Sequence, residues 1–321
     1  MTQHLPDNAV ETVALSKTYQ GSHGQPPMLA LDDVTLSIPR GSFFGLLGPN
    51  GAGKSTLINI LAGLVIRTSG SARIWGFDIE DDMRAARRSI GAVPQELNID
   101  PFFTPREALD LQAGMYGVPK AARRTLEILD AVGLADKADV YSRTLSGGMR
   151  RRLLVGKALV HSPPVLVLDE PTAGVDVDLR RQLWAYIRGL NANGTTILLT
   201  THYLQEAQEL CDTIAIINHG KLIACEPKSS MMRRLDAKEI TLTLDQDISS
   251  VPEQLGHFHV ELSGPRQLRF CYPPSNTNSG EILAAVQAAG LVITEIDTRD
   301  SALEDVFISL TSAQSSGTDV P

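Results

Sequence analysis

Residues 48–55, GPNGAGKS, have the types and the spacing of a phosphate-binding loop. They fit the pattern G-x-x-x-x-G-K-[S/T] and lie between an apolar strand and a helix whose apolar residues are Leu57, Ile60, Leu61 and Leu64. Glycines let backbone N–H groups face phosphate oxygens, and the helix N-terminus adds partial positive charge. We therefore expect Lys54 to bridge two phosphates of a nucleoside triphosphate and Ser55 to ligate Mg²⁺. An incidental glycine-rich turn is the alternative.

A pair of acidic residues follows the apolar run VLVL at 165–168. Asp169 stands at the end of this predicted buried strand, where α/β sheets bind ligands, and an aspartate there can hold Mg²⁺ through water. Glu170 is then in position to orient or deprotonate an attacking water. The alternative is that both acids cap the helix beyond Pro171. Together with the phosphate loop, the pair favours triphosphate hydrolysis.

A second anion-binding pattern occurs at LSGGM, residues 145–149. Ser146, Gly147 and Gly148 stand just before a basic amphipathic helix, so its N–H donors would suit a phosphate. A serine with glycines is also an ordinary helix N-cap, and taken alone this simpler interpretation is favoured.

These residues need a sheet to hold them. The runs PPVLVLDEP and TTILLTTH read as continuous apolar strands that flank a helix, which indicates a parallel sheet buried on both faces. Strands are also expected at 10–20 and around 71–95, and residues 105–160 are expected to be mostly helical. Thr104, Pro105 and Glu107 form a predicted capping box at the start of that helical part.

The composition shifts near residues 235–240, where a small α+β unit is expected to begin. Its predicted elements are EITLTLD, QLRFCY, a helix GEILAAVQAAG, a strand LVITEID and a short helix at 300–310 with an apolar stripe. That stripe consists of Leu303, Val306, Phe307 and Leu310. Residues 236–311 offer no catalytic cluster, and the polar residues 312–321 are expected to be disordered.

The overall composition limits the possible functions. The chain has 321 residues, 43% hydrophobic residues and a formal net charge of −8, which argues against nonspecific nucleic-acid binding. No apolar run reaches the roughly 18 residues that a membrane helix needs, and the N-terminus does not resemble a secretory signal. The three cysteines are widely spaced and suggest neither a disulfide framework nor a metal site.

The order of the motifs over residues ~10–235 resembles that of the ATP-binding cassette (ABC) ATPases. The resemblance implies a P-loop NTPase core with a parallel-rich sheet, an antiparallel β-subdomain and an inserted helical subdomain at about 96–160, within a domain of residues 1–235. In that family the LSGG loop closes on ATP held by the partner subunit. The resemblance thus implies a head-to-tail dimer with two composite ATP sites, which would explain two phosphate-binding patterns in one chain.

The resemblance also assigns individual residues. It implies nucleotide contacts from Gly48, Pro49, Asn50, Gly51, Ala52, Gly53, Lys54, Ser55 and Thr56, and from Ser146, Gly147 and Gly148 across the dimer. Tyr19 matches an aromatic that stacks on adenine, with a core tyrosine as the alternative, and Asp176 matches an aspartate that crosses the interface. Gln95 and His202 match residues that reach the attacking water and the γ-phosphate. Catalysis is thus assigned to Glu170, His202 and Gln95, and Mg²⁺ binding to Ser55, Gln95 and Asp169.

The sequence departs from the common family pattern in places. Met149 stands where many cassettes have glutamine, and AGVD replaces the more usual aspartate segment around Asp176. Both departures leave the reacting groups intact. Arg150, Arg151 and Arg152 follow the LSGG loop, and most of them are expected to face solvent or neighbouring acids.

The resemblance favours one role among three for the ATPase. A regulatory cassette would lack Glu170 or His202, and a non-transport ATPase of the ribosome or DNA would carry two cassettes or long coiled coils. The remaining role is the ATP-hydrolysing subunit of a transporter, with a separate polytopic membrane permease and no nucleic-acid partner. It implies a cytoplasmic protein on the inner face of the membrane. The segment LEDVF within residues 300–310 resembles the ending of cassettes from drug and polysaccharide exporters, and LQAGMYG at 111–117 resembles a helical sequence of the same group.

Overall fold

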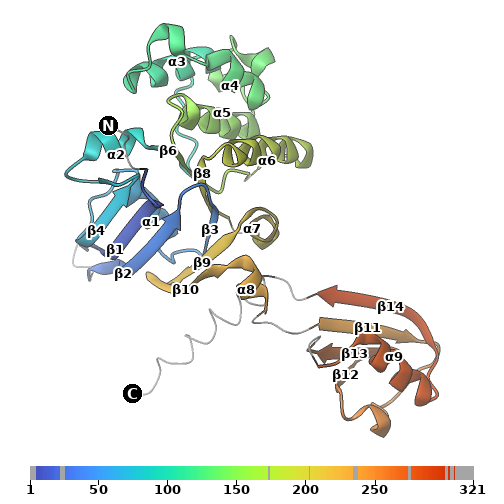
Figure 1. Cartoon of the computed structure of the whole chain (residues 1–321). Helices are drawn as coiled ribbons and strands as arrows, with labels where there is room; N and C mark the ends of the chain where they lie inside the picture. Colours follow the sequence, from blue (N-terminus) through green and yellow to red (C-terminus); the bar gives the residue numbers. More distant parts are fainter. Residues whose placement is uncertain are drawn as a thin grey trace. The chain divides into compact units, whose positions relative to one another are not determined.

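The chain forms two compact units, Met1–Pro227 and Lys228–Pro321 (Figure 1). The computed structural model describes residues 5–21, 26–172, 174–201, 203–233, 238–273 and 276–300, together with Leu303 and Phe307. His202, Val306, Leu310 and the predicted tail 312–321 lie outside the described residues.

A six-stranded sheet forms the centre of the first unit, in the order β10-β9-β3-β8-β7-β6. Its strands are β3 (Phe43–Leu47), β6 (Ile90–Val93), β7 (Val165–Asp169), β8 (Thr196–Thr200), β9 (Thr213–Asn218) and β10 (Lys221–Pro227). All neighbours pair in parallel except β9 and β10. Every residue of β3, β7 and β8 is buried, so the predicted parallel sheet covered on both faces is confirmed. The edge strand β10 was not predicted.

Helix α1 (Lys54–Leu61) follows β3 and packs against β2, β4 and β7. Its apolar residues Leu57, Ile60 and Leu61 are buried, as the sequence predicts. The prediction for Leu64 is wrong, because this side chain is 72% exposed. The helix ends before it, at Leu61, and Gly63 just beyond has a φ of +70°, the left-handed conformation that terminates helices.

A second, antiparallel sheet has the order β2-β1-β4-β5. It consists of β1 (Asn8–Tyr19), β2 (Met28–Pro39), β4 (Ser69–Ile74) and β5 (Phe77–Asp78), and α2 (Met83–Arg88) follows. Alternate side chains such as Val10 and Ile38 join one core cluster with Phe44 and Leu57. This sheet thereby fixes the far side of α1, which positions the start of that helix.

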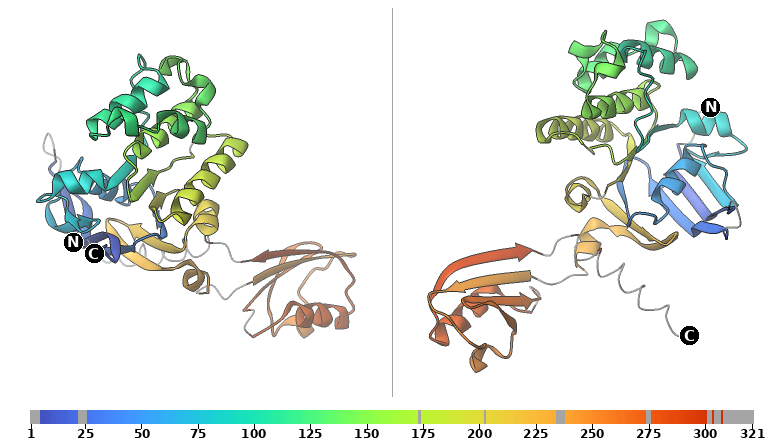
Figure 2. Two further views of the ribbon diagram at one scale, coloured as in Figure 1. Left: turned by 45° about the horizontal axis from the view of Figure 1, so that its top comes forward. Right: turned by 180° about the vertical axis from the view of Figure 1, so that it is seen from behind.

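The helical part contains α3 (Pro105–Met115), α4 (Thr125–Ala131) and α5 (Gly147–Leu159), which pack on one another. Both views of Figure 2 show the three helices grouped together. Short 3-10 turns connect them at Lys120–Ala122, Ala135–Lys137 and Ser142–Thr144. The predicted capping box is confirmed: the Thr104 hydroxyl accepts from the Glu107 N–H, and the Glu107 carboxylate accepts from the Thr104 N–H.

Helix α6 (Val177–Ala192) follows β7, and α7 (Leu204–Leu210) follows β8. These two helices complete the alternation of strand and helix that the parallel sheet requires. In the described part of the chain, none of the helices is both long enough and apolar enough to cross a bilayer.

The second unit is an antiparallel sheet of order β12-β13-β11-β14. Its elements are α8 (Lys228–Arg233), β11 (Lys238–Leu244), a 3-10 turn (Glu253–Leu255), β12 (His259–Gly264), β13 (Gln267–Tyr272), α9 (Ser279–Ala288) and β14 (Ile293–Asp300). Alternate residues of β11 and β13 form its core with Ile282 and Val286 of α9. The edge strand β12, mostly exposed, was not predicted. Of the predicted helix 300–310, Leu303 and Phe307 are helical and Leu303 is buried.

Two of the three arginines after the LSGG loop are buried, and Arg152 departs from the expectation that these side chains face solvent or neighbouring acids. Arg152 is 3% exposed and donates from Nη1 to the carbonyls of Val132, at 2.6 Å, and Gly133, at 2.7 Å. These carbonyls lie at the C-terminal end of α4, where a cation is favourable. Arg152 therefore joins α5 to α4 instead of facing solvent.

We expect Arg152→Met to lower the free energy of unfolding of the first unit by about 2 kcal/mol, because both carbonyls lose a charged donor. Urea unfolding followed by tryptophan fluorescence measures this unit alone, since Trp75 and Trp184 are the two tryptophans of the chain and both belong to it. Arg84→Met, at an exposed position of α2, is the matched control. Equal midpoints for the two variants would contradict the structural role of Arg152.

Candidate active site

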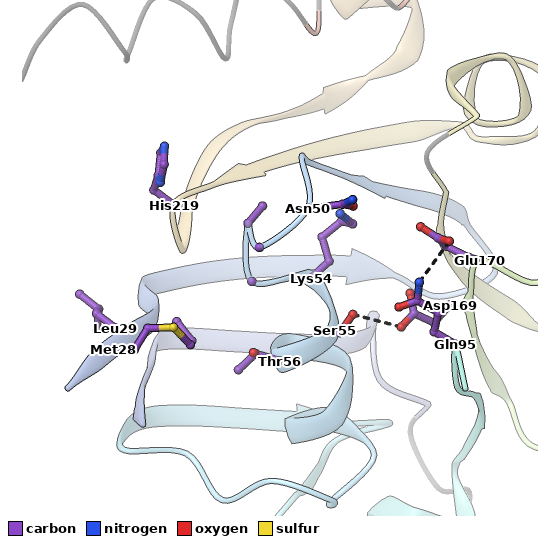
Figure 3. Close-up of a pocket in the computed structure, with 14 residues that line it drawn as sticks. Met28, Leu29, Asn50, Lys54, Ser55, Thr56, Gln95, Asp169, Glu170 and His219 are labelled. Atoms are coloured by element: carbon purple, nitrogen blue, oxygen red, sulfur yellow. Dashed lines mark hydrogen bonds between the residues drawn. The ribbon is translucent and has the colours of Figure 1, made fainter. Parts of the chain in front are cut away.

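A cleft of 530 Å³ lies at the carboxyl ends of β3 and β7 (Figure 3). Its lining residues are Met28, Leu29, Ala30, Asn50, Gly51, Ala52, Gly53, Lys54, Ser55, Thr56, Gln95, Asp169, Glu170 and His219. The structure thus brings most of the phosphate loop together with the predicted acids and Gln95, although these segments are far apart in the sequence.

Glycines let the phosphate loop pass close to other backbone segments. Gly53 has φ +108°, and a Cβ there would lie 2.6 Å from the Ala30 carbonyl oxygen. A Cβ at Gly48 would lie 2.3 Å from the Ile217 carbonyl oxygen. Because neither backbone neighbour can move away cheaply, the loop conformation requires glycine at both positions.

Lys54 begins α1 and is 9% exposed. Its ammonium donates to the loop's own carbonyls, 2.6 Å from Gly48 O and 3.0 Å from Pro49 O. Burial lowers the pKa of Lys54, and the nearby carboxylates of Glu170 and Asp169 oppose that shift. The cleft therefore contains a desolvated cation opposite two acids, and its interactions are stronger there than in bulk water.

Ser55 and Asp169 meet across the cleft, with Ser55 Oγ donating to Asp169 Oδ2 at 3.3 Å. The hydroxyl of Thr200 donates to the other carboxylate oxygen and fixes its orientation. Asp169 is buried. A hydroxyl and a carboxylate held together are hard oxygen ligands, which Mg²⁺ prefers when it also binds phosphates. These residues fit the predicted magnesium site.

Gln95 and Glu170 also meet, with Gln95 Nε2 donating to Glu170 Oε2 at 3.4 Å (Figure 3). Gln95 stands two residues beyond β6 and Glu170 directly after β7, so the pairing of these strands places them together. Glu170 has φ +49°, which is uncommon for a residue other than glycine. Its N–H donates to Thr200 O at 3.1 Å.

Arg151 is a neighbour of the acids, in line with the expectation for the arginines after the LSGG loop, but it is buried. It donates from Nη1 to Pro94 O at 2.9 Å. Burial lowers the pKa of Arg151, while the carboxylates of Asp169 and Glu170 raise it. Arg151 precedes Leu154 and Val155 by three and four residues, which puts it on the buried face of α5. This spacing could have predicted its burial from the sequence.

The opposite end of the cleft is apolar. Met28 and Leu29 are exposed, and His219 lies on the same side (Figure 3). Tyr19 is not part of the cleft lining, but it pairs with Met28 across β1 and β2, and Lys17 Nζ lies 4.9 Å from the centre of its ring. Sequence reasoning missed Met28, Leu29 and His219. For Met28 and Leu29, the available signal was their position as an apolar pair directly after the glycine- and proline-rich sequence GSHGQPP at 21–27.

The remaining predicted residues form a separate group. Ser146 caps α5 by accepting from the Met149 N–H at 3.2 Å, and Asp176 caps α6 by accepting from the Leu179 N–H at 3.0 Å. The two helix starts adjoin, because a Cβ at Gly148 would lie 3.2 Å from Gly174 O. None of these residues lines the cleft.

Comparison with known proteins agrees with this arrangement. The sequence profile of the family described as "ABC transporter" matches residues 31–173. A daunorubicin/doxorubicin resistance ATP-binding protein of Streptomyces peucetius is 37% identical, with 95% of this chain and 93% of that protein covered. A Nod factor export ATP-binding protein I of Ralstonia nicotianae is 35% identical, with 88% of each covered. A linearmycin resistance ATP-binding protein of Bacillus subtilis is 34% identical over 87% of this chain and 92% of that protein.

Solved structures give the same result. A dimeric ATP-binding cassette in a post-hydrolysis state, bound to ADP and Pi, matches with a TM-score of 0.63 and 28% identity. The match covers 68% of this chain and 98% of that one. The P-loop fold, the cleft and these relatives together show that the chain belongs to the ABC transporter family and is one of its ATP-hydrolysing cassettes.

Proposed function

We propose that the chain powers an exporter and that the cleft hydrolyses MgATP with the residues that the sequence singled out. The observation that carries the proposal is the meeting of Lys54, Asp169 and Glu170 in one cleft. The phosphate-loop N–H groups and Lys54 bind the triphosphate, and Lys54 exchanges its two carbonyl contacts for phosphate oxygens. Residues 1–235 are the ATPase domain, and residues 236–311 take no part in the chemistry.

In this proposal Ser55, Asp169 and Gln95 hold the Mg²⁺ that accompanies ATP. When bound there, Mg²⁺ would supply positive charge that offsets the charge of the phosphate oxygens. The carboxylate of Glu170 orients the attacking water and accepts its proton, and Gln95 holds that carboxylate in place. His202 is proposed to contact the γ-phosphate.

The apolar end of the cleft suits the nucleotide base. Met28 and Leu29 offer an exposed apolar surface at the end of the phosphate loop away from the acids. Tyr19, paired with Met28, is proposed to stack on the adenine ring.

The group of Ser146, Gly147, Gly148 and Asp176 is proposed to act on the nucleotide of a second cassette. Its position outside the cleft of its own chain supports this assignment. In a head-to-tail pair with two-fold symmetry, the N-terminus of α5 would face the partner's phosphates, and both sites would be equivalent. Two of the similar solved cassettes are described as dimeric.

Export is the proposed use of the hydrolysis energy. The relatives are named for resistance to daunorubicin, doxorubicin and linearmycin and for export of Nod factor. We infer a separate polytopic membrane subunit and a location of this chain on the inner face of the cell membrane. The proposed contact surface consists of Phe102 and Met115, exposed apolar side chains of the segment 96–118 that follows Gln95, and of exposed Leu64, which lines a hollow together with Pro94.

Glu170→Gln is expected to lower the turnover of ATP by at least about a hundredfold, because the amide cannot accept the proton of water. ATP binding should persist, and the ATP-bound dimer should accumulate. Phosphate release and nucleotide binding are measured on the same preparation, with size-exclusion chromatography for the dimer. Glu209→Gln, a change of an exposed carboxylate on α7, is the control. Turnover by Glu170→Gln at the parent rate would refute the assignment of the base.

The composite site is tested by mixing two inactive variants. Lys54→Ala removes the phosphate contact of one protomer, and Gly148→Asp places a negative charge at the N-terminus of α5 in the other. If the site is shared, a mixed dimer contains one site with neither defect, and random pairing restores about a quarter of the parental turnover. If each chain hydrolyses ATP by itself, the mixture stays as inactive as either variant.

The export assignment is tested by purifying Glu170→Gln with MgATP from gently solubilised membranes of its native cell. A stoichiometric polytopic membrane protein, identified by mass spectrometry, is the expected companion. Ribosomal or DNA-bound proteins in its place would contradict export and leave the ATPase assignment intact.

A further inference from the structure

A buried carboxylate outside the cleft lining connects two of the loops near it. Glu206 lies on α7 and is 8% exposed. It accepts from Thr172 Oγ1 at 2.7 Å with one oxygen and from Thr201 Oγ1 at 2.9 Å with the other. Both threonines are buried.

The two threonines belong to neighbouring loops. Thr172 stands two residues beyond Glu170 in the segment after β7, and Thr201 directly follows β8. Because β7 and β8 pair in parallel, both loops leave the sheet at the same edge. One carboxylate of α7 thus holds the segment that carries Glu170 against the adjoining loop.

The backbone at Glu170 needs such support. A residue other than glycine in the left-handed region is strained, and this conformation persists only where the surroundings impose it. The bond from the Glu170 N–H to Thr200 O fixes one side of the residue. The bond from Thr172 to Glu206 fixes the other side, because only Pro171 lies between Glu170 and Thr172.

The charge on Glu206 is compensated. Arg180 Nε lies 3.8 Å from Glu206 Oε1, and the Arg180 guanidinium lies over the ring of Tyr203. Two hydroxyl donors and one cation together stabilise a carboxylate that would otherwise be costly to bury. A glutamine in its place would keep the shape of the side chain, but its NH₂ group cannot accept a hydrogen bond from a threonine.

We propose that Glu206 is a positioning residue for ATP hydrolysis: it holds the loop after β7 so that the carboxylate of Glu170 meets the attacking water. The inference rests on the proposed function, in which Glu170 is the base. Glu206 acts on turnover and not on nucleotide binding, because the phosphate loop belongs to the β3–α1 connection. Within the described part of the chain, the side chain of Glu206 contacts Thr172, Thr201 and Arg180, and none of these belongs to that loop.

Glu206→Gln is expected to lower kcat and kcat/KM together by at least about tenfold, while the dissociation constant for ATP changes by less than about twofold. The matched control is Glu209→Gln, three residues further along α7. Glu209 is 72% exposed and pairs with Arg188 on the surface, so this variant should keep the parental kcat. A merely structural role would reduce the fraction of competent protein, which titration of nucleotide sites detects, without slowing the competent molecules.

A threonine pair makes the test independent of how well the Glu206 variant folds. Thr172→Val removes the hydroxyl at constant shape and should lower kcat, and Thr172→Ser keeps the hydroxyl and should restore it. Adding Glu206→Gln to Thr172→Val should cost less than it costs in the parent, because the two residues share one interaction. Parental kcat in both Glu206→Gln and Thr172→Val overturns the inference.

The variants separate the positioning role of Glu206 from the assignment of Glu170 as the base. If Glu170→Gln is inactive while the Glu206 and Thr172 variants turn over normally, only the positioning role is lost. If Glu170→Gln hydrolyses ATP at the parental rate, the assignment of the base is wrong, and the role of Glu206 falls with it.

Discussion

The parallel pairing of β3, β8 and β7 is the constraint on which the active site depends. Parallel strands release their chains at one edge of the sheet, so the phosphate loop after β3 and the acids after β7 emerge side by side. The strand between them, β8, contributes Thr200, which orients Asp169 by its hydroxyl and Glu170 by its carbonyl. A shift of register by one residue would reverse the side chains of a strand and separate these groups.

Burial then decides how the charges act. Lys54 and Arg151 are largely removed from water and lie near Asp169 and Glu170. Each cation loses the stabilisation of its hydration shell and regains part of that stabilisation from the carboxylates. Such groups are oriented before a ligand arrives and need little reorganisation during the reaction. The same balance explains Arg152 and Glu206, whose buried charges meet helix-end carbonyls and threonine hydroxyls.

Local patterns made much of this arrangement predictable. Continuous apolar runs indicated the buried strands, and the spacing in residues 48–55 and 165–170 indicated the phosphate loop and the acids that the structure brings into one cleft. The capping box at Thr104 was predictable because it involves only neighbours in the sequence. The sequence did not predict that Met28, Leu29 and His219 line the cleft, because tertiary packing brings them to the phosphate loop. The edge strands β10 and β12 were missed because one-sided pairing leaves a weaker apolar pattern, and Arg151 and Arg152 because basic residues are usually exposed.

The charge of the cleft explains why one cassette would need another. Among the described residues that line it, Lys54 is the single lysine or arginine, opposite the carboxylates of Asp169 and Glu170. MgATP brings further negative charge, which grows on the phosphate oxygens as hydrolysis proceeds. The N-terminus of α5, with Ser146 at its start, is a source of oriented N–H donors, but its own chain does not turn it toward the cleft. A second chain that supplies this helix end would add positive potential when the pair closes, so turnover and closure would be one event. An open cassette would bind ATP with too little positive charge to hydrolyse it. The closing movement could therefore be the step that drives a membrane partner.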